Sequence, residues 1–136
     1  MIESIPMVAY IDLNFTNIKV PIAHFKIIMD YIMKTKDCRK VNELTNSLFT
    51  CVCKNFYDCG FPKLKIYLQT PNSPHGFNLT LNSSQYIRYD FATLRCIVLL
   101  EPDHFNVDGG AWRLGQIFLN SYYTIFDAEI QRIGFV

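Results

Sequence analysis

Two stretches in the middle of the chain alternate between apolar and polar residues, and this alternation limits the fold to one built on strands. In KLKIYLQ, residues 63–69, leucine or isoleucine fills every second position, and FNLTLNSSQYI, residues 77–87, repeats the pattern. Side chains two residues apart share a face of a strand, so each stretch has one apolar face. TPNSPHG between them has the composition of a turn, and the three segments together predict a β-hairpin.

The N-terminal third contains the best candidate for a helix. In PIAHFKIIMDYIMKTK, residues 21–36, apolar residues recur at steps of three and four, which predicts an amphipathic helix. Pro21 suits its first turn, and Lys34 and Lys36 suit its end. Before it, MVAYIDL predicts a short buried strand that ends at Asp12.

The C-terminal third adds further strands. LRCIVLLE, residues 94–101, predicts one buried strand, and PDHFNVDGG after it predicts a loop. Residues 112–136 predict a turn, a short helix, a strand, a tight turn and a strand. With 136 residues, half of them hydrophobic, and no visible linker, we expect a single domain.

Composition excludes several classes of function. The net charge is +1 and no dense lysine and arginine stripe occurs, so we expect no nucleic-acid partner. No apolar run approaches the roughly 20 residues of a membrane span. The N-terminus carries Glu3 and lacks a basic start with a long apolar stretch, so it predicts no signal peptide.

Five cysteines are present, so at least one lacks a partner within the chain. Cys51, Cys53 and Cys59 form a cluster, but their spacing is not that of a zinc site and no histidine lies nearby. Disulfides are therefore favoured over a metal, and we expect neither metal nor cofactor. Three N-glycosylation sequons begin at Asn14, Asn78 and Asn82, and they matter only if the chain enters the secretory pathway.

The last 23 residues, LGQIFLNSYYTIFDAEIQRIGFV, resemble the C-terminal end of the pepsin-like aspartic peptidases. That family has an apolar-Leu-Gly segment, a short helix with a Phe, paired aromatics in YYTVFD and a final IGFA strand. The matching residues here are Leu114, Gly115, Phe118, Tyr122, Tyr123, Thr124, Phe126, Asp127, Ile133, Gly134 and Phe135. So many fixed spacings make this match far more specific than a short motif.

The resemblance extends upstream to about Val8. FPKLKIYL and FNLTLNSSQYI are similar to the family's corresponding strand and hairpin, which a disulfide flanks. This implies a bond from Cys53 to Cys96, with Cys51 and Cys59 as rivals of Cys53, and such a loop of about 43 residues would stabilise the fold by roughly 3–4 kcal/mol. The family's second catalytic aspartate precedes a helix-opening proline by nine residues, as Asp12 precedes Pro21.

The resemblance implies a mainly β fold. The expected structure is a partial C-terminal lobe of the pepsin-like fold over residues 1–136, with an amphipathic helix after the active-site loop and a short helix near the C-terminus. Peptidases of this family use two aspartates that share a proton, one from each lobe, and no cofactor. The implied partner is a peptide or protein substrate, or a second lobe-like chain, with a dimer as one form. The family also implies a secretory or lysosome-like compartment.

The loop departs from the family's Asp-Thr-Gly-Ser/Thr motif. Leu13 replaces the threonine, Asn14 the glycine and Phe15 the hydroxylic residue, and Thr16 restores a hydroxyl only if the register slips. Leucine and phenylalanine cannot supply the hydrogen bonds that hold a catalytic carboxylate. Arg113, before Leu114, replaces an apolar residue that the family buries beside this loop, and pairing with Asp12 would end the acid–base role of that carboxylate.

Three alternative hypotheses about the function follow from these observations. The first is an aspartic-peptidase-like protein that is a catalytically incompetent fragment or pseudo-peptidase lobe. The second is an active aspartic endopeptidase completed by a second lobe or by dimerisation, as retroviral peptidases are. The third is a non-catalytic peptide-binding or interaction module. The bland interpretation of Asp12 is an ordinary turn aspartate, and only the spacing to Pro21 and the downstream match raise it above that.

Overall fold

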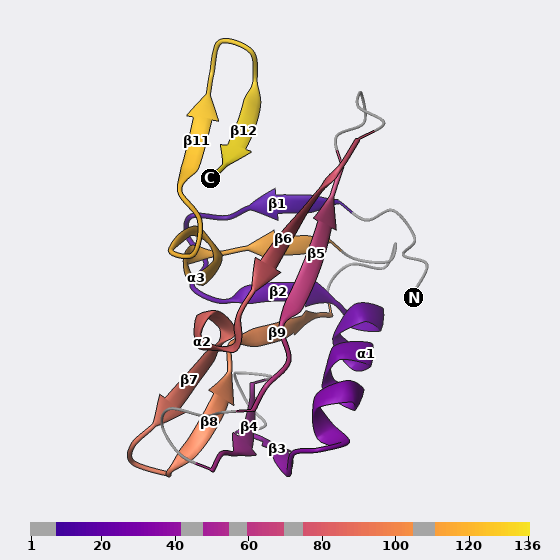
Figure 1. Ribbon diagram of the computed structural model, residues 1–136, viewed down its shortest axis with the longest axis vertical. Coiled ribbons are helices and arrows are strands. Elements are labelled where there is room, and N and C mark those ends of the chain that lie inside the picture. Colours follow the sequence, from indigo (N-terminus) through magenta and orange to yellow (C-terminus); the bar gives the residue numbers. More distant parts are fainter. Residues whose placement is uncertain (1–7, 42–47, 55–59, 70–74, 105–110) are drawn as a thin grey trace. The chain divides into compact units, whose positions relative to one another are not determined.

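A computed structural model of the chain describes residues 8–41, 48–54, 60–69, 75–104 and 111–136 (Figure 1). The described elements are mainly β-strands, with one long and two short helices. The chain divides into two compact units, residues 1–28 with 100–136 and residues 29–99. The single partial domain expected over residues 1–136 stays a prediction.

The first unit contains a four-stranded sheet in the order β1-β10-β2-β9 (Figure 1). Its strands are β1 (Ala9–Ile11), β10 (Trp112–Leu114), β2 (Ile18–Pro21) and β9 (Leu100–Asp103). β10 runs parallel to β1 and antiparallel to β2, and β2 runs parallel to β9. The sheet therefore joins segments that are about a hundred residues apart in the sequence.

The side chains that face the interior of this unit come from both ends of the chain. Ile18, Val20, Leu100, Leu114 and Phe118 are at most 1% exposed. Burying a large aliphatic or aromatic side chain contributes about 1.5–3 kcal/mol, so these contacts are the main stabilisation of the unit.

A short helix and a hairpin complete the first unit. They are α3 (Gln116–Leu119), β11 (Thr124–Asp127) and β12 (Arg132–Phe135). The ring of Phe118 lies 5.3 Å from that of Tyr122 and 5.5 Å from that of Phe135, which joins the helix to the hairpin. The predicted helix, strand, turn and strand of residues 112–136 are thus confirmed, but the predicted turn at residues 112–114 is strand β10.

Helix α1 (Ile22–Met33) confirms the predicted amphipathic helix. Phe25, Met29 and Ile32 are at most 5% exposed, as their three- and four-residue spacing predicts. The helix starts one residue later than expected, because Pro21 is the last residue of β2. It also ends earlier than expected, at Met33, where the N–H groups of Thr35 and Lys36 both donate to the carbonyl of Ile32.

The second unit contains a four-stranded sheet in the order β3-β4-β8-β7 and a separate hairpin. The sheet comprises β3 (Cys38–Lys40), β4 (Phe49–Val52), β8 (Arg95–Val98) and β7 (Ile87–Asp90), all paired antiparallel. β5 (Leu64–Leu68) and β6 (Phe77–Leu81) form the hairpin, and α2 (Ser83–Tyr86) follows it. The hairpin confirms the prediction made from the alternating residues, whereas α2 was not predicted.

Two expectations about buried strands are wrong. β1 is not buried, because it has β10 as its one neighbour among the described strands, and Tyr10 is 56% exposed. The apolar run at residues 94–101 is not one strand, because it breaks at Leu99, whose N–H donates to the carbonyl of Tyr86 at 2.8 Å. The run is apolar throughout, so its sequence carries no sign of this break.

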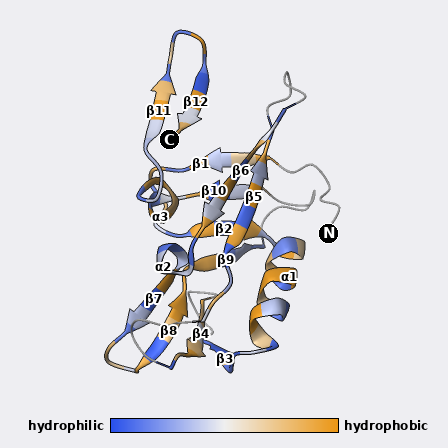
Figure 2. Ribbon diagram, in the orientation of Figure 1, coloured by the Kyte–Doolittle hydropathy of each residue, from blue (hydrophilic) through white to orange (hydrophobic). Residues whose placement is uncertain are grey.

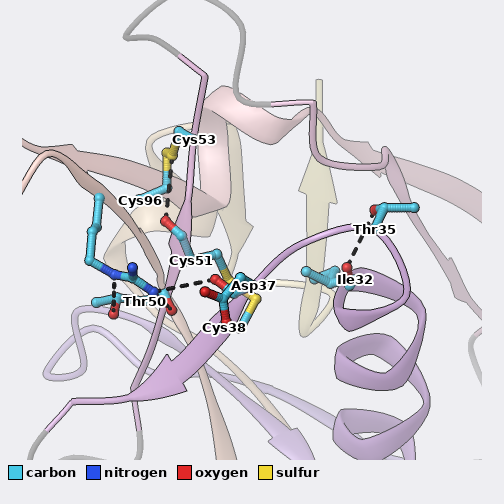
Figure 3. The surroundings of a disulfide bond; sticks show 9 residues. Ile32, Thr35, Asp37, Cys38, Thr50, Cys51, Cys53 and Cys96 are labelled. Carbon is cyan, nitrogen blue, oxygen red and sulfur yellow. Dashed lines mark hydrogen bonds between the residues drawn. A yellow bond between two sulfur atoms is a disulfide. The ribbon is translucent and has the colours of Figure 1, made fainter.

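The second unit holds two disulfides (Figure 3). Cys53 is bonded to Cys96, which is the pair that the resemblance implies. Cys38 is bonded to Cys51, a pair that sequence analysis did not predict. Cys51 faces Cys38 on β3 and Cys96 on β8, so the three lie in one row across the sheet. The other rival of Cys53, Cys59, lies outside the described residues.

A single arginine braces the strands that carry these cysteines. Arg95 donates hydrogen bonds to the hydroxyl and the carbonyl of Thr50 and to the carbonyl of Asp37, at 3.1–3.3 Å. Thr50 is 6% exposed, so its hydroxyl obtains its partner from within the protein.

Candidate active-site loop

Asp12 follows β1 directly and opens the loop that leads to β2. Its backbone N–H donates to the carbonyl of Leu114 at 3.1 Å. Its side-chain Oδ1 accepts a hydrogen bond of 3.0 Å from the N–H of Asn14, and its carbonyl accepts one of 3.4 Å from the N–H of Phe15. These bonds make a tight turn in which aspartate is a typical first residue.

The segment after β10 holds the loop from the other side. The N–H groups of Gln116 and Ile117 donate to the carbonyls of Phe15 and Thr16 at 2.8 and 3.0 Å. These are first-turn donors of α3, which have no partner inside their own helix. The side-chain Nε2 of Gln116 also donates to the carbonyl of Leu13 at 3.2 Å. The loop is therefore fixed by backbone contacts that do not depend on most of its side chains.

Gly115 allows this close approach. A Cβ atom at this position would lie 2.2 Å from the carbonyl oxygen of Asn17 and 2.3 Å from that of Phe15. Both neighbours are backbone atoms, and the carbonyl of Phe15 is held by the N–H of Gln116. The glycine is therefore required by space, since its φ of −85° is accessible to any residue.

The carboxylate of Asp12 is paired with a cation. Arg113 Nη1 lies 3.6 Å from Asp12 Oδ2, and the two side chains are 47% and 28% exposed. The pairing that the sequence analysis considered is therefore present, but the guanidinium is not buried as the position implied. Within the described residues, no hydroxyl donates a hydrogen bond to Asp12.

The side chains that replace the family's threonine, glycine and hydroxylic residue make no hydrogen bond to the carboxylate of Asp12 in the described part of the chain. Leu13 is 61% exposed, and Asn14 and Thr16 are exposed as well. Phe15 is partly buried, and Lys19 Nζ lies 5.1 Å from the centre of its ring. A cation over an aromatic face is a stabilising contact, so Phe15 has a structural partner in this unit.

The structure brings together all the loop residues that the sequence analysis named. Leu13, Asn14, Phe15, Thr16, Leu114 and Gly115 lie with Asp12 in the first unit. Cys53 and Cys96 belong to the second unit. Sequence reasoning missed the contact of Gln116 with the loop and the hydrogen bond from Asn17 Nδ2 to Glu101 Oε1, which is 3.0 Å long. A polar residue at a helix start gave the only available signal for Gln116.

His24 lies beside the same sheet and has a single described hydrogen bond. Its Nδ1 accepts from Trp112 Nε1 at 3.2 Å, so this nitrogen is unprotonated. Burial lowers the pKa of His24 below its ordinary value of 6.5. His24 is therefore a partly buried residue of α1 that packs against Trp112.

Other site types find no support in the part of the chain that the structure describes. No group of three histidine, cysteine, aspartate or glutamate side chains is placed to hold a metal ion there. Likewise, none of the described helices has the length and apolar character needed to span a bilayer.

Comparison with known proteins decides the family. The sequence matches the family described as eukaryotic aspartyl protease over residues 11–136. The chain belongs to this family. Its mainly β fold, with α1 after the loop and α3 near the C-terminus, is that of a partial pepsin-like lobe.

Three curated relatives show how much of a longer protein the chain matches. Plasmepsin VII of Plasmodium berghei (strain Anka) is 48% identical over 52 residues, which cover 38% of this chain and 11% of that protein. Beta-secretase of Strongylocentrotus purpuratus is 24% identical over 137 residues, covering 92% of this chain and 25% of that protein. Gastricsin of Mus musculus is 37% identical over 62 residues, which cover 44% of this chain and 15% of that protein. The chain thus spans a quarter or less of these curated relatives.

Proposed function

We propose that this chain is a C-terminal lobe of an aspartic-peptidase-like protein that does not hydrolyse peptides by itself. The observation that carries the proposal is the ion pair between Asp12 and Arg113, 3.6 Å apart. Asp12 occupies the position of the second catalytic aspartate. The cation that pairs with its carboxylate, Arg113, belongs to the same chain.

The chemistry of the family explains why this pairing is incompatible with catalysis. Two close carboxylates split their proton affinities, so that one acts as base and the other as acid on a shared water. Asp12 is the only aspartate of the chain that a proline follows after nine residues, the spacing of the family's second catalytic aspartate. Its carboxylate contacts the guanidinium and a backbone N–H, and neither is a proton acceptor.

The side chains around Asp12 support the same conclusion. Catalytic geometry has to be held within about 0.5 Å by residues that are themselves locked in place. Leu13 is 61% exposed and Phe15 packs under Lys19, so neither holds the carboxylate. Gly115 and the N–H groups of α3 still hold the backbone of the loop. The hydroxyl groups of the family motif are absent, because Leu13 and Phe15 replace the residues that carry them.

The experiment is a hydrolysis assay with the purified chain. We expect no cleavage of unstructured peptides at acid pH at any protein concentration, and no difference between the chain and Asp12→Asn. Cleavage that Asp12→Asn abolishes would overturn the proposal. A rate that then rises with the square of the protein concentration would assign the activity to a dimer, and a linear rate to the single chain.

A non-catalytic interaction module is the second candidate, because apolar side chains are exposed on the β11–β12 hairpin. Ile125, Phe126, Ile130 and Ile133 are 45–55% exposed, and Figure 2 shows the apolar character of β11. Exposed apolar patches mark interaction surfaces. The expected occupant is a second lobe-like chain or an extended peptide. Light scattering should then show a dimer that Phe126→Asp and Ile133→Asp dissociate, while a monomer that binds no peptide would exclude this candidate.

A further inference from the structure

Asn14 belongs to a sequon that the proposed function does not use. Asn14, Phe15 and Thr16 form an N-x-T triplet inside the candidate active-site loop. We propose that Asn14 is an N-glycosylation site, so that a glycan covers the loop that carries Asp12. This proposal does not depend on whether the loop is active.

The geometry of the loop leaves the acceptor amide accessible. Asn14 and Thr16 are both exposed, and Asn14 lies in the turn that Asp12 opens. The backbone N–H of Asn14 is used in that turn, whereas its side-chain amide makes no hydrogen bond to any described residue. An exposed asparagine in a surface loop is the position that N-linked glycans occupy in secreted proteins.

The disulfides favour an oxidising compartment, which is the setting that N-glycosylation needs. Cys38–Cys51 and Cys53–Cys96 join four of the five cysteines. Disulfides form and persist in the secretory pathway and are rare in the cytosol. The same pathway attaches N-linked glycans, so the two features support one another.

The other two sequons are less available in the folded chain. Asn78 lies within β6, where it pairs with Tyr67 across the hairpin. Asn82 is the N-cap of α2, and its N–H donates to Gln85 Oε1 at 2.7 Å in a capping box. Both are exposed, but Asn78 lies within a strand and Asn82 caps a helix. Asn14 is the sequon in a loop.

The reaction needs a lipid-diphosphate-linked oligosaccharide as the donor and the transferase of the secretory pathway. The amide nitrogen of Asn14 attacks the anomeric carbon of the first sugar and loses one proton. An N-glycosidic bond forms, and the bond between the anomeric carbon and the diphosphate oxygen breaks. The lipid diphosphate leaves with the electron pair, and no oxidant or reductant is required.

A glycan at this position would block access to the loop. Asn14 is two residues from Asp12 and its backbone N–H lies 3.0 Å from Asp12 Oδ1, so a glycan on Asn14 would be attached beside the residue that carries the carboxylate. A flexible, hydrated oligosaccharide there would exclude an extended peptide from Asp12 and would cover the exposed Leu13. The glycan would therefore add a steric barrier to the ion pair with Arg113.

The experiment uses the full chain behind a cleavable secretory leader in cultured animal cells. Peptide:N-glycosidase treatment in heavy-oxygen water converts each glycosylated asparagine into a labelled aspartate, which mass spectrometry locates. We expect the label at Asn14, its loss in Thr16→Ala and its retention in Thr16→Ser, the matched control that keeps the sequon. Protein retained inside the cells is analysed in the same way as secreted protein.

Two results would overturn the proposal. One is an unlabelled Asn14 in protein that carries label at Asn78 or Asn82, which would show that the pathway was reached and this site refused. The other is the absence of label at all three sequons. Neither result bears on whether Asp12 is catalytic, so this test fails independently of the hydrolysis assay.

Discussion

Arg113 Nη1 lies 3.6 Å from Asp12 Oδ2 across the parallel pairing of β10 and β1, in which Tyr10 is the register partner of Arg113. Both side chains remain in contact with solvent, at 47% and 28% exposure. Exposed ion pairs contribute at most about 1 kcal/mol to folding. The pair therefore matters for the chemistry of the loop rather than for the stability of the lobe.

Replacing Arg113 should accordingly have little effect on folding. We expect Arg113→Met to change the free energy of unfolding by less than about 1 kcal/mol in denaturant titrations. Arg132→Met is a matched control, because Arg132 Nε lies 3.7 Å from Asp127 Oδ2 at higher exposure. A loss several times larger in Arg113→Met than in Arg132→Met would mean that the loop depends on the ion pair for its structure.

Gly115 should tolerate replacement far less well than Arg113. Its missing Cβ would meet backbone oxygens at 2.2 and 2.3 Å, so we expect Gly115→Ala to lower the free energy of unfolding by about 1–3 kcal/mol or more. Gly134→Ala is the control, because the nearest atom to its Cβ would be Ile125 Cβ at 3.8 Å. Equal stability of the two variants would show that the loop does not approach Gly115 as closely as described.

The two disulfides should contribute different amounts to the free energy of unfolding. Cys53–Cys96 closes 43 residues and Cys38–Cys51 closes 13, so the chain-entropy relation gives about 4 and about 3 kcal/mol. We expect the paired serine variants to lose stability in that order. Paired replacement is needed because Cys51 faces Cys96 in the sheet and would exchange with it once Cys38 is absent. A greater loss from removing Cys38–Cys51 would contradict the prediction.

Acid should weaken the first unit through His24. Burial lowers the pKa of His24, so below the ordinary value of about 6.5 the unfolded chain binds more protons than the folded chain. Stability contributed by the neutral histidine is complete above that value and is lost progressively as the pH falls below it. The fluorescence of Trp112, the single tryptophan, reports the unfolding. His24→Gln should reduce this pH dependence, and an unchanged dependence would exclude His24 as its source.

Local patterns predicted the elements that depend on local physics. The alternation at residues 63–69 and 77–87 predicted β5 and β6, and the spacing of Phe25, Met29 and Ile32 predicted α1. Strand partners were not predictable in the same way. β10 lies between β1 and β2, about a hundred residues away, and its three residues carry no period long enough to reveal a strand.

The candidate site was predicted from a resemblance and not from periodicity. The spacing from Asp12 to Pro21 and the Leu114–Gly115 pair indicated which segments meet, and the structure brings them together. The contact of Gln116 with Leu13 was not predictable, because a glutamine at a helix start is usually solvated. The exposure of Arg113 was not predicted. The resemblance implied a buried position, and the residues that surround β10 are known only from the folded chain.

The loop itself is tested most directly in a peptidase that already has both lobes. The second Asp-Thr-Gly-Thr of a pepsin-like enzyme is replaced by the Asp12–Phe15 sequence of this chain, Asp-Leu-Asn-Phe, together with arginine before its Leu-Gly pair. Because small misplacements of catalytic groups cost about 100-fold or more, we predict at least that loss in kcat with the folded state retained in circular dichroism. A kcat within a few-fold of the parent enzyme would contradict the account.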